Sequence, residues 1–511
     1  MPAHHAVIIG AGVGGLAAAI DLAVRGLAVT VVERASGPGG KLRGVGIGGR
    51  TLDAGPTVLT MRPVFEQLFD DAGAALADHV TLRPLDVIAR HAWSETERLD
   101  LFADPRQSAQ AIGDFAGAAA AKEFEAFSAR AKRIFDTLDM SFMRAQRPDP
   151  VSLAIAVAPQ GLGRLWGISP FTTLWQALGR HFHDPRLRQL FGRYATYCGA
   201  SPFKAPATLM LVAHAEQGGV WTVDGGMHRL ATALARLAVA RGVTIRYGTD
   251  VAEVLVARGR ACGVRLATNE HLIADAVISN ADAAALSSGL FGRKAEHAAP
   301  KMPPKARSLS AVTWTMNATA RGFPLHRHNV FFSADYPAEF SDLGRGRLPR
   351  DPTVYVCAQD RDDGTSAPEG PERLLCLINA PATGDGHPFD APEIEQCRET
   401  TFRRLAICGL RLSSTPTDTM MTTPADFHRL YPATGGALYG RASHGWLASF
   451  QRPAARSKLP GLYLAGGSTH PGPGVPMAAI SGRLAAQSLI ADLVSTRPSR
   501  ATVMHGGTSM R

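Results

Sequence analysis

The chain has 511 residues, of which 45% are hydrophobic and 19% charged, as is typical of a globular protein with a large core and more than one domain. Its 54 Lys and Arg residues exceed its 44 Asp and Glu residues and give a net charge of +10. The basic residues are scattered and form no nucleic-acid-binding motif, which argues against a nucleic-acid partner and leaves attraction to an anionic membrane surface open.

The spacing of the cysteines and of the apolar residues further restricts the class of protein. The chain has six cysteines, Cys198, Cys262, Cys357, Cys376, Cys397 and Cys408. They form no CxxC pair and no metal-ligand spacing, so we expect reduced core thiols in a cytosolic protein and no metal site. We also expect no signal peptide and, without a run of about 18 apolar residues, no membrane-spanning helix.

The predicted elements begin and end with the pattern of a parallel α/β sheet. In chain order they are a strand, helix and strand over 6–33, the turn-rich segments GGKLRG and TLDAGPTVLT, helices over 105–215, short strands from 242 to AVISNAD, the strands SLSAVTWTMN, TVYVCAQD and RLLCLINAP with a helix near 392–408, and a strand at 461–465 followed by the helix MAAISGRLAAQSLIADLV. Strands that alternate with helices in this way predict a parallel sheet with helices on its faces.

The α/β pieces at the start, middle and end predict one discontinuous domain. It comprises residues 1–75, 216–290 and 430–496, and a second domain of residues 76–215 and 291–429 is inserted between these pieces. Residues 497–511 lack a hydrophobic period, and we expect a disordered tail there.

The first glycine-rich turn predicts a dinucleotide site. Gly10, Gly12 and Gly15 stand in G-x-G-x-x-G spacing between a strand and a helix, which permits a tight turn, close approach of a pyrophosphate and close packing of the helix. Glu33 ends the next strand, where a carboxylate accepts hydrogen bonds from ribose hydroxyls. The alternative is a tight strand–helix turn followed by an exposed glutamate.

The residues after Glu33 favour a flavin. Gly39, Gly40 and Lys41 complete an E-x₅-GG-K arrangement, which is typical of flavoproteins of the two-dinucleotide-motif type. The paired glycines allow close chain approach, and we expect Lys41 near a phosphate or ribose. A solvated surface cation is the alternative for Lys41.

Several motifs spread from Val7 to about Ile490 carry a resemblance. They are GAGVGGLAAAIDLAVRG, ERASGPGGK, LDAGPTVLTM, GGVWTVDGGM, ISNAD and YLAGGSTHPGPGVP. On these motifs the chain resembles the carotenoid desaturase family of FAD oxidoreductases, which is related to amine oxidases and protoporphyrinogen oxidase. The segment YCGASPFKAPATLMLVAHAEQGGVW is most similar to the hydroxycarotenoid 3,4-desaturases (hydroxyneurosporene desaturases) of phototrophic bacteria.

The resemblance implies an α/β fold, with a discontinuous Rossmann-type FAD-binding domain and an inserted α+β substrate domain. It implies FAD-dependent oxidation of an acyclic 1-hydroxycarotenoid between carbons 3 and 4, in carotenoid biosynthesis of the spheroidene or spirilloxanthin type. Because nothing resembles a second nucleotide site, we expect oxygen or a quinone as the electron acceptor. We expect the protein in the cytoplasm, peripherally associated with the inner photosynthetic membrane.

The family's FAD contacts map onto specific positions of this chain. The resemblance places the following residues at FAD: Gly10, Gly12, Gly14 and Gly15 at the pyrophosphate, Glu33 at the ribose, Lys41, Thr57 and Val58 near the flavin, Val251 at the adenine through its backbone, Asn280 at the return to the cofactor domain, and Gly467, Val475, Pro476 and Met477 at the flavin ring. The helix that opens near Val475 presents N–H groups and a positive dipole end to an electron-rich flavin edge. Many relatives in the wider superfamily have an acidic residue just after the final strand, where this chain has GGS. We therefore expect backbone contact there, from Gly467.

Some of these positions have a purely structural alternative. Thr57 and Val58 also fit a turn formed by Gly55 and Pro56. Val251 alone reads as sheet core, and only the resemblance favours a cofactor contact. Asn280 is equally compatible with a helix cap before ADAAAL.

Desaturation removes two hydrogens from adjacent, non-acidic carbons. We expect hydride transfer to the flavin, an allylic cation delocalised over the polyene, and loss of a proton from the neighbouring carbon. Asp139, His444 and Arg452 are candidates for the base by family neighbourhood only, and none is assigned.

The apolar stretch over residues 151–182, which contains Leu165, Trp166 and Phe171, is a candidate interfacial entrance for a membrane-resident substrate. Core helices of the second domain are an equally good interpretation.

Three other functions remain compatible with the motifs. The first is a phytoene or other carotene desaturase, and the second is an amine-type flavin oxidase. The third is a lipid-binding escort protein that has lost its flavin. The intact glycine turn, Glu33 and the closing motif YLAGGSTHPGPGVP argue against the escort protein.

Overall fold

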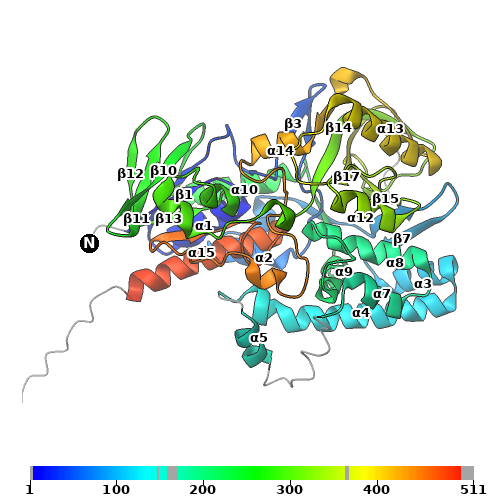
Figure 1. The fold of residues 1–511 in the computed structure, drawn as a ribbon, viewed down its shortest axis with the longest axis horizontal. Helices are drawn as coiled ribbons and strands as arrows, with labels where there is room; N and C mark the ends of the chain where they lie inside the picture. The colour runs from blue at the N-terminus through cyan, green and yellow to red at the C-terminus, as the bar shows by residue number, and fades with distance from the viewer. Residues whose placement is uncertain (1–3, 147–148, 158–170, 363–367, 496–511) are drawn as a thin grey trace, which may run out of the picture.

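A five-stranded parallel sheet draws its strands from both ends and the middle of the chain (Figure 1). The computed structural model describes residues 4–146, 149–157, 171–362 and 368–495. The sheet has the order β20-β13-β1-β2-β9, with β1 His5–Ile9, β2 Ala28–Val32, β9 Thr244–Arg246, β13 Ala276–Ser279 and β20 Leu462–Leu464. All four pairings are parallel. Its central strands are almost continuously apolar, as expected for a parallel sheet covered on both faces.

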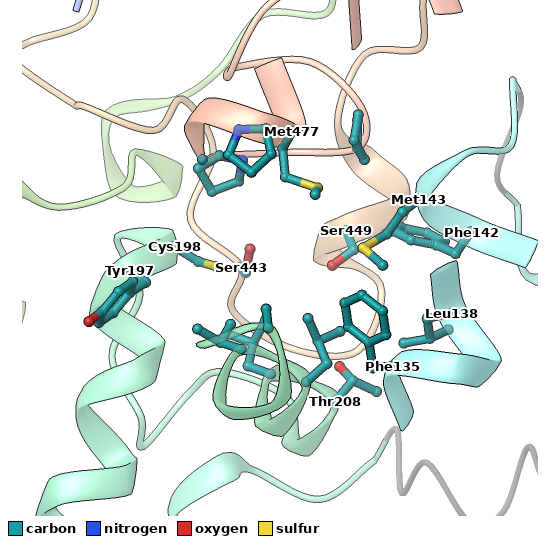
Figure 2. Close-up of a pocket in the computed structure, with 18 of the residues that line it drawn as sticks. Phe135, Leu138, Phe142, Met143, Tyr197, Cys198, Thr208, Ser443, Ser449 and Met477 are labelled. Atoms are coloured by element: carbon teal, nitrogen blue, oxygen red, sulfur yellow. The ribbon is translucent and has the colours of Figure 1, made fainter. Parts of the chain in front are cut away.

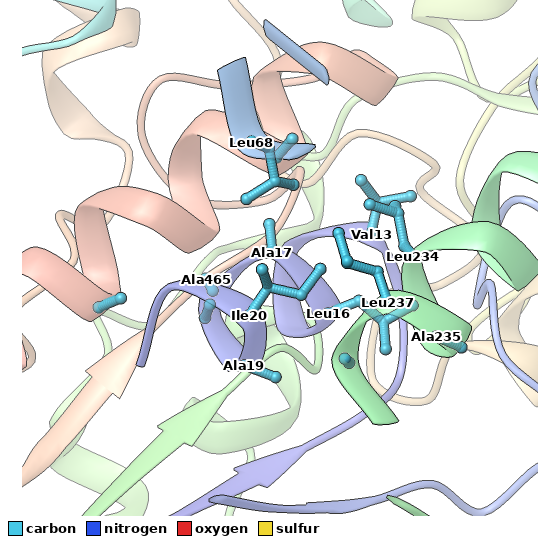
Figure 3. Packing of buried hydrophobic residues seen from close by; sticks show 14 of the residues in the cluster. Val13, Leu16, Ala17, Ala19, Ile20, Leu68, Leu234, Ala235, Leu237 and Ala465 are labelled. Atoms are coloured by element: carbon cyan, nitrogen blue, oxygen red, sulfur yellow. The ribbon is translucent and has the colours of Figure 1, made fainter. Parts of the chain in front are cut away.

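Apolar helices cover this sheet and bring the two ends of the chain together. They are α1 Val13–Val24, α2 Pro63–Asp71, α10 His228–Ala240 and α15 Val475–Ser495. Figure 3 shows Leu16 and Ile20 of α1 beside Leu68 of α2 and Leu237 of α10, all fully buried. Asp21, the one charged residue within α1, is neutralised by Arg483 of α15 at 3.2 Å.

The last helix is long and apolar enough to cross a membrane by length and composition. Half of its most apolar window is nevertheless buried inside the protein, where the helix packs along α1. Its apolarity is therefore explained by core packing.

Three smaller sheets flank the parallel sheet. The antiparallel β10 Val251–Ala257, β11 Arg260–Leu266 and β12 His271–Ile273 form one, and β3 Gly44–Ile47 with β4 Arg50–Asp53 and β5 Leu82–Pro84 with β8 Trp221–Val223 form the others. The β3–β4 hairpin corrects the prediction of turns alone in GGKLRG and TLDAGPTVLT. Both strands are only four residues long, so their alternation is too short to recognise in the sequence.

An eight-stranded mixed sheet lies on the other side of the molecule (Figure 1). Its order is β18-β14-β17-β16-β15-β6-β7, and β19 also pairs with β14. The strands are β6 Val87–Ala92, β7 Arg98–Phe102, β14 Ser310–Arg321, β15 His328–Phe331, β16 Val354–Ala358, β17 Glu372–Ala380, β18 Arg411–Ser413 and β19 Thr419–Thr422. The helices near it are α12 Tyr336–Gly344, α13 Ala391–Ile407 and α14 Pro424–Leu430.

The helices predicted between residues 105 and 215 are confirmed and pack beneath this sheet (Figure 1). They are α3 Pro105–Ala116, α4 Ala118–Leu138, α5 Pro150–Val157, α7 Leu174–His181, α8 Pro185–Gly192 and α9 Leu211–Gln217, with a π-helical turn at Asp139–Met143. Asp104, Thr173 and Asp184 cap the N-termini of α3, α7 and α8 through their side chains. The short α11 Ala283–Ser287 follows β13. Single 3₁₀ turns occupy Leu76–Asp78, Arg193–Cys198, Ala207–Met210, Arg293–Ala298, Pro304–Ala306, Pro416–Asp418 and Ala448–Gln451.

Some expectations from the sequence are not tested by the fold. The domain division at 75, 215, 290 and 429 stays a prediction. The tail at 497–511 lies outside the described residues, as do Leu165 and Trp166.

Candidate active site

The glycine turn at the start of α1 leaves the helix N-terminus open. Gly10 has a φ of +97°, which favours glycine, and Gly12 precedes the helix without a side-chain cap. A Cβ on Gly15 would lie 2.1 Å from the carbonyl oxygen of Gly10, so the helix packs directly against the turn. An uncapped N-terminus with a glycine surface fits the pyrophosphate of a dinucleotide.

Asn280 lies over this turn and does not cap a helix. Its Nδ2 is 3.5 Å from the carbonyl oxygen of Gly10, and a Cβ on either Gly12 or Gly14 would lie 2.7 Å from its amide group. The cap of α11 is Asp282, whose carboxylate accepts from the Ala284 N–H. The helix-cap interpretation of Asn280 is therefore wrong, and its position fits the predicted cofactor contact.

Glu33 is fixed at the carboxyl end of β2, next to the glycine turn. Its Oε2 accepts from the Ala11 N–H at 2.7 Å and its Oε1 accepts from the Ala35 N–H at 2.8 Å. The residue is 8% exposed, so the interpretation as an exposed glutamate is wrong. Each carboxylate oxygen retains lone-pair capacity, which fits an acceptor for ribose hydroxyls.

Lys41 is partly buried between the two ends of the chain. Its Nζ donates to the carbonyl oxygen of Leu438 at 2.5 Å, and burial lowers its pKa. Nearby, the Gly39 N–H donates to the carbonyl oxygen of Ala11 at 2.9 Å, which holds the paired glycines against the first turn. The interpretation of Lys41 as a solvated surface cation is therefore wrong.

Val251 begins β10 and is buried in an apolar cluster with Ile9 and Val32. It is 6% exposed and pairs with Leu266 in the β10–β11 ladder. This is the placement expected for sheet core, and its backbone contact with adenine stays a prediction.

The closing segment packs onto the first glycine turn, so both ends of the chain meet. A Cβ on Gly14 would lie 2.9 Å from Gly466 N and from Ala478 O. A Cβ on Gly467 would meet nothing closer than Pro473 at 4.0 Å, which leaves open space at its backbone. Gly467 therefore fits the predicted backbone contact.

A large apolar pocket begins at the N-terminus of α15 (Figure 2). Its lining is mostly apolar, and part of it is open to solvent. Val58, Val475, Pro476 and Met477, all predicted at the flavin, are among the residues that line it. Figure 2 shows Met477 across the pocket from Phe135 and Thr208.

Thr57 lies behind this pocket wall. Its Oγ1 shares a hydrogen bond of 2.7 Å with the hydroxyl of Tyr355, which is also 2.7 Å from Nδ1 of His328. Burial lowers the pKa of His328 to about 3, so its imidazole is neutral. These two hydrogen bonds fix the turn that presents Val58 to the pocket.

The three candidates for the base occupy different places. Asp139 bonds Arg144 at 3.1 Å, and neither it nor His444 is among the lining residues. His444 accepts from the Ser201 N–H at 3.0 Å. Arg452 lines the pocket, but its guanidinium donates to the carbonyl oxygens of Tyr439 and Arg441, and its pKa, lowered by burial to about 10, keeps it protonated at neutral pH. None of the three has the position and protonation state of a base.

Sequence reasoning missed several polar residues in the pocket wall, among them Tyr197 and Glu216. Glu216 is 3% exposed and is the one carboxylate among the described lining residues. The signal in the sequence was an acidic residue near the end of the mostly apolar segment LMLVAHAEQ.

The sequence matches the family described as flavin containing amine oxidoreductase over residues 13–490. The chain therefore belongs to this family, and it is an FAD-dependent oxidoreductase. The glycine turn, Glu33 and the open backbone at Gly467 fit FAD, as shown above.

Individual relatives indicate which branch of the family this chain is most similar to. The chain is 55% identical over 510 residues, 99% of this chain and 97% of the relative, to a hydroxyneurosporene desaturase of Rubrivivax gelatinosus. It is 47% identical over 490 residues, 96% of this chain and 98% of the relative, to a hydroxyneurosporene desaturase of Cereibacter sphaeroides. The resemblance to carotenoid desaturases is thereby confirmed.

The fold has solved counterparts as well. An oxidoreductase from Methanosarcina mazei matches with a TM-score of 0.58 at 18% identity and covers 95% of this chain and 100% of that one. This likeness concerns the fold alone, and together with the family match it confirms the predicted α/β FAD-binding class.

Proposed function

We propose that this protein desaturates an acyclic 1-hydroxycarotenoid between carbons 3 and 4, in carotenoid biosynthesis. The observation that carries the proposal is the 55% identity, over nearly the whole chain, to a relative named hydroxyneurosporene desaturase. The pocket supports it, since an elongated hydrocarbon requires a long apolar wall next to the flavin side.

The chain's own residues position the reactants. The glycine turn, Glu33 and Lys41 would bind and orient the cofactor, and Val58 and Met477, which line the pocket, would lie where the substrate meets it. Bound FAD supplies a ring that accepts two electrons from the substrate. The apolar lining excludes water from the C–H bonds that react.

The substrate is insoluble in water, so we extend the proposal to docking on a lipid bilayer. Six large apolar side chains are exposed beside lining residues, and we call them the mouth patch: Met140, Val151, Ile155, Phe171, Trp446 and Leu447. Met140 lies between the lining residues Leu138 and Phe142, and Val151 and Ile155 flank the lining residue Leu153. Phe171 packs edge-on against Trp446, with ring centroids 5.2 Å apart.

An exposed apolar patch that is continuous with a pocket for a lipid-soluble ligand supports interfacial binding. We also propose that the protein acts in the cytoplasm, peripherally on the inner photosynthetic membrane, with oxygen or a quinone as electron acceptor.

The test uses purified holoenzyme with carotenoids in liposomes. We expect the pigment with a 1-hydroxyl group to gain one double bond, seen as a red-shifted absorption spectrum, and to reduce the flavin under anaerobic conditions. Conversion of phytoene, or flavin reduction by amines with no change in the hydroxycarotenoid, would contradict the proposal. A colourless protein that binds carotenoid would indicate an escort function instead.

A further inference from the structure

A buried carboxylate with two phenolic partners interrupts the apolar pocket wall. Glu216, on α9, accepts from the Tyr197 hydroxyl at 2.5 Å through Oε1 and from the Tyr194 hydroxyl at 2.6 Å through Oε2. Arg193 donates to the Tyr197 hydroxyl at 3.1 Å and is itself buried. Of this cluster, Tyr197 and Glu216 line the pocket.

The cluster lies at the flavin end of the pocket. Tyr197 and Glu216 share the pocket lining with Val58 and Met477, which are predicted at the flavin. Cys198, the next residue, also lines the pocket, as does Arg452, which donates to the carbonyl oxygen of Gly467 at 3.3 Å. Figure 2 shows Tyr197 and Cys198 on the side of the pocket opposite Phe142 and Leu138, which adjoin the mouth patch.

A carboxylate in such a wall is costly unless it has hydrogen-bond partners. Two hydroxyl donors occupy one lone pair on each oxygen of Glu216, while each oxygen can accept more than one hydrogen bond. The structure thus keeps an oriented carboxylate acceptor in a wall that is mostly apolar.

We propose that Tyr197 and Glu216 bind the hydroxyl group of the carotenoid, with the substrate O–H donating to the Glu216 carboxylate. This inference rests on the proposed function. The oxygen of a hydroxyl on carbon 1 is three bonds from carbon 3, so its binding site must lie close to the flavin, and the cluster lies in the lining shared with the residues predicted there. The bond selects hydroxylated substrates and sets which carbon–carbon bond meets the flavin.

The location argues for binding rather than proton removal. Both oxygens of Glu216 already accept phenolic hydrogen bonds, which hold the carboxylate in place in the pocket wall. A site that hydrogen-bonds a substrate hydroxyl discriminates strongly against the analogue without it, because its own polar groups are then left unpaired.

The test compares Glu216→Gln and Tyr197→Phe with the wild-type holoenzyme, on a 1-hydroxycarotenoid and on the same carotenoid without the hydroxyl. We expect each variant to raise KM for the hydroxylated pigment about 10- to 100-fold, the equivalent of one lost bond in a buried site. The KM for the unhydroxylated pigment should change less than about twofold. Where the wild type does not convert that pigment, its inhibition constant is compared instead.

Tyr463→Phe is the matched control. Tyr463 is also buried and donates to a carboxylate, Asp492, at 2.8 Å, but it does not line the pocket. This control should keep the preference for the hydroxylated pigment. FAD content and melting temperature show whether each variant folds, and two different substitutions protect the test against the failure of one.

Each outcome decides the question. Loss of preference in both variants supports the proposal. An equal loss on both pigments indicates a base or a structural role and overturns it, as does an unchanged preference. If the wild type and both variants prefer the hydroxylated pigment, this inference is overturned and the proposed function is not. If the wild type is inactive on both pigments, the proposed function is overturned, and this inference with it.

Discussion

Because its glycines have no side chains, the first glycine turn can adopt a backbone conformation and accept a ligand that other residues would exclude. Gly10 supplies a backbone conformation, whereas Gly12 and Gly14 supply space next to the amide group of Asn280. Between them the backbone N–H groups of α1 face a surface with no Cβ atoms, where an anionic group approaches closely. The two kinds of requirement predict different consequences for substitution.

We predict that Gly12→Ala weakens FAD binding about 10- to 100-fold. The new Cβ would lie 2.7 Å from Asn280 Nδ2 and would also occupy the side on which the pyrophosphate approaches. Flavin content after gel filtration measures the effect. Gly46→Ala is the control, because Gly46 is exposed and a Cβ there meets nothing within 4 Å. Full flavin occupancy in Gly12→Ala would contradict the assignment.

The local part of this site was predictable from the sequence. Gly12 and Glu33 are separated by a single strand–helix–strand unit, so their spacing alone places them together. Asn280 and Glu216 were not assigned in the same way, because their positions depend on strand order and on packing between distant segments. For Asn280 the competing cap was Asp282, two residues further along a segment with two good capping residues.

At the scale of elements, the crossing of α1 and α15 joins the two ends of the chain. A Cβ on Gly482 would lie 2.0 Å from the carbonyl oxygen of Gly14, so backbone meets backbone at the crossing point. The helices approach this closely only because both positions lack side chains.

We predict that Gly482→Ala destabilises the holoenzyme by about 1–3 kcal/mol and lowers its FAD content, because α15 must move away from the glycine turn. Thermal unfolding followed by flavin fluorescence measures both effects. Gly344→Ala, at the end of α12 where a Cβ meets nothing within 4 Å, should be neutral or slightly stabilising. Equal melting temperatures for the two variants would show that the crossing tolerates separation.

Glu339 makes the stability of the eight-stranded sheet depend on pH. This buried residue of α12 accepts from Ser333 at 2.9 Å and from Thr353 at 2.7 Å, which connects the helix to the segments beside β15 and β16. Burial raises its pKa to about 7. A raised carboxyl pKa contributes stability that is complete below the unfolded value of about 4.5 and is lost as the pH rises through 7.

We predict that wild type loses about 2–3 kcal/mol relative to Glu339→Gln between pH 5 and pH 8, since glutamine keeps the shape without ionising. Urea unfolding of both proteins at the two pH values checks this. Glu399→Gln, an exposed carboxyl on α13, should follow wild type at both. A pH-independent difference between wild type and Glu339→Gln would show that Glu339 is not neutralised on folding.

Long elements, and short strands within the recognisable α/β pattern, were predictable, whereas short strands outside that pattern were not. The strands β14 and β17 and the helix α13 are 12, 9 and 17 residues long, and each was expected near its observed place. The hairpins β3–β4 and β6–β7 were not assigned. Their partners are set by tertiary contacts, such as the parallel pairing of β6 with β15 across more than two hundred residues.

At the scale of the whole molecule, the pocket runs from the closing motif to the mouth patch. Its flavin end contains Met477 and Val58, and its outer end contains Phe142 and Leu153, next to the exposed residues Met140 and Ile155. A ligand that resides in a bilayer would reach the flavin end without crossing water if the mouth patch rests on the lipid.

We predict that replacement of Met140, Ile155 and Phe171 by Ser lowers binding to anionic liposomes roughly 10- to 100-fold, because three side chains, each 68–71% exposed, no longer bury apolar surface in lipid. Vesicle co-sedimentation measures the binding, and flavin content confirms the fold. The matched control replaces three other exposed side chains, Val239, Ile273 and Ile407, which lie on α10, β12 and α13 away from the pocket lining. This control should bind as wild type does. Equal loss in both triple variants would mean that the protein has no oriented docking face, and unchanged binding in both would remove the mouth patch from the account of how substrate enters.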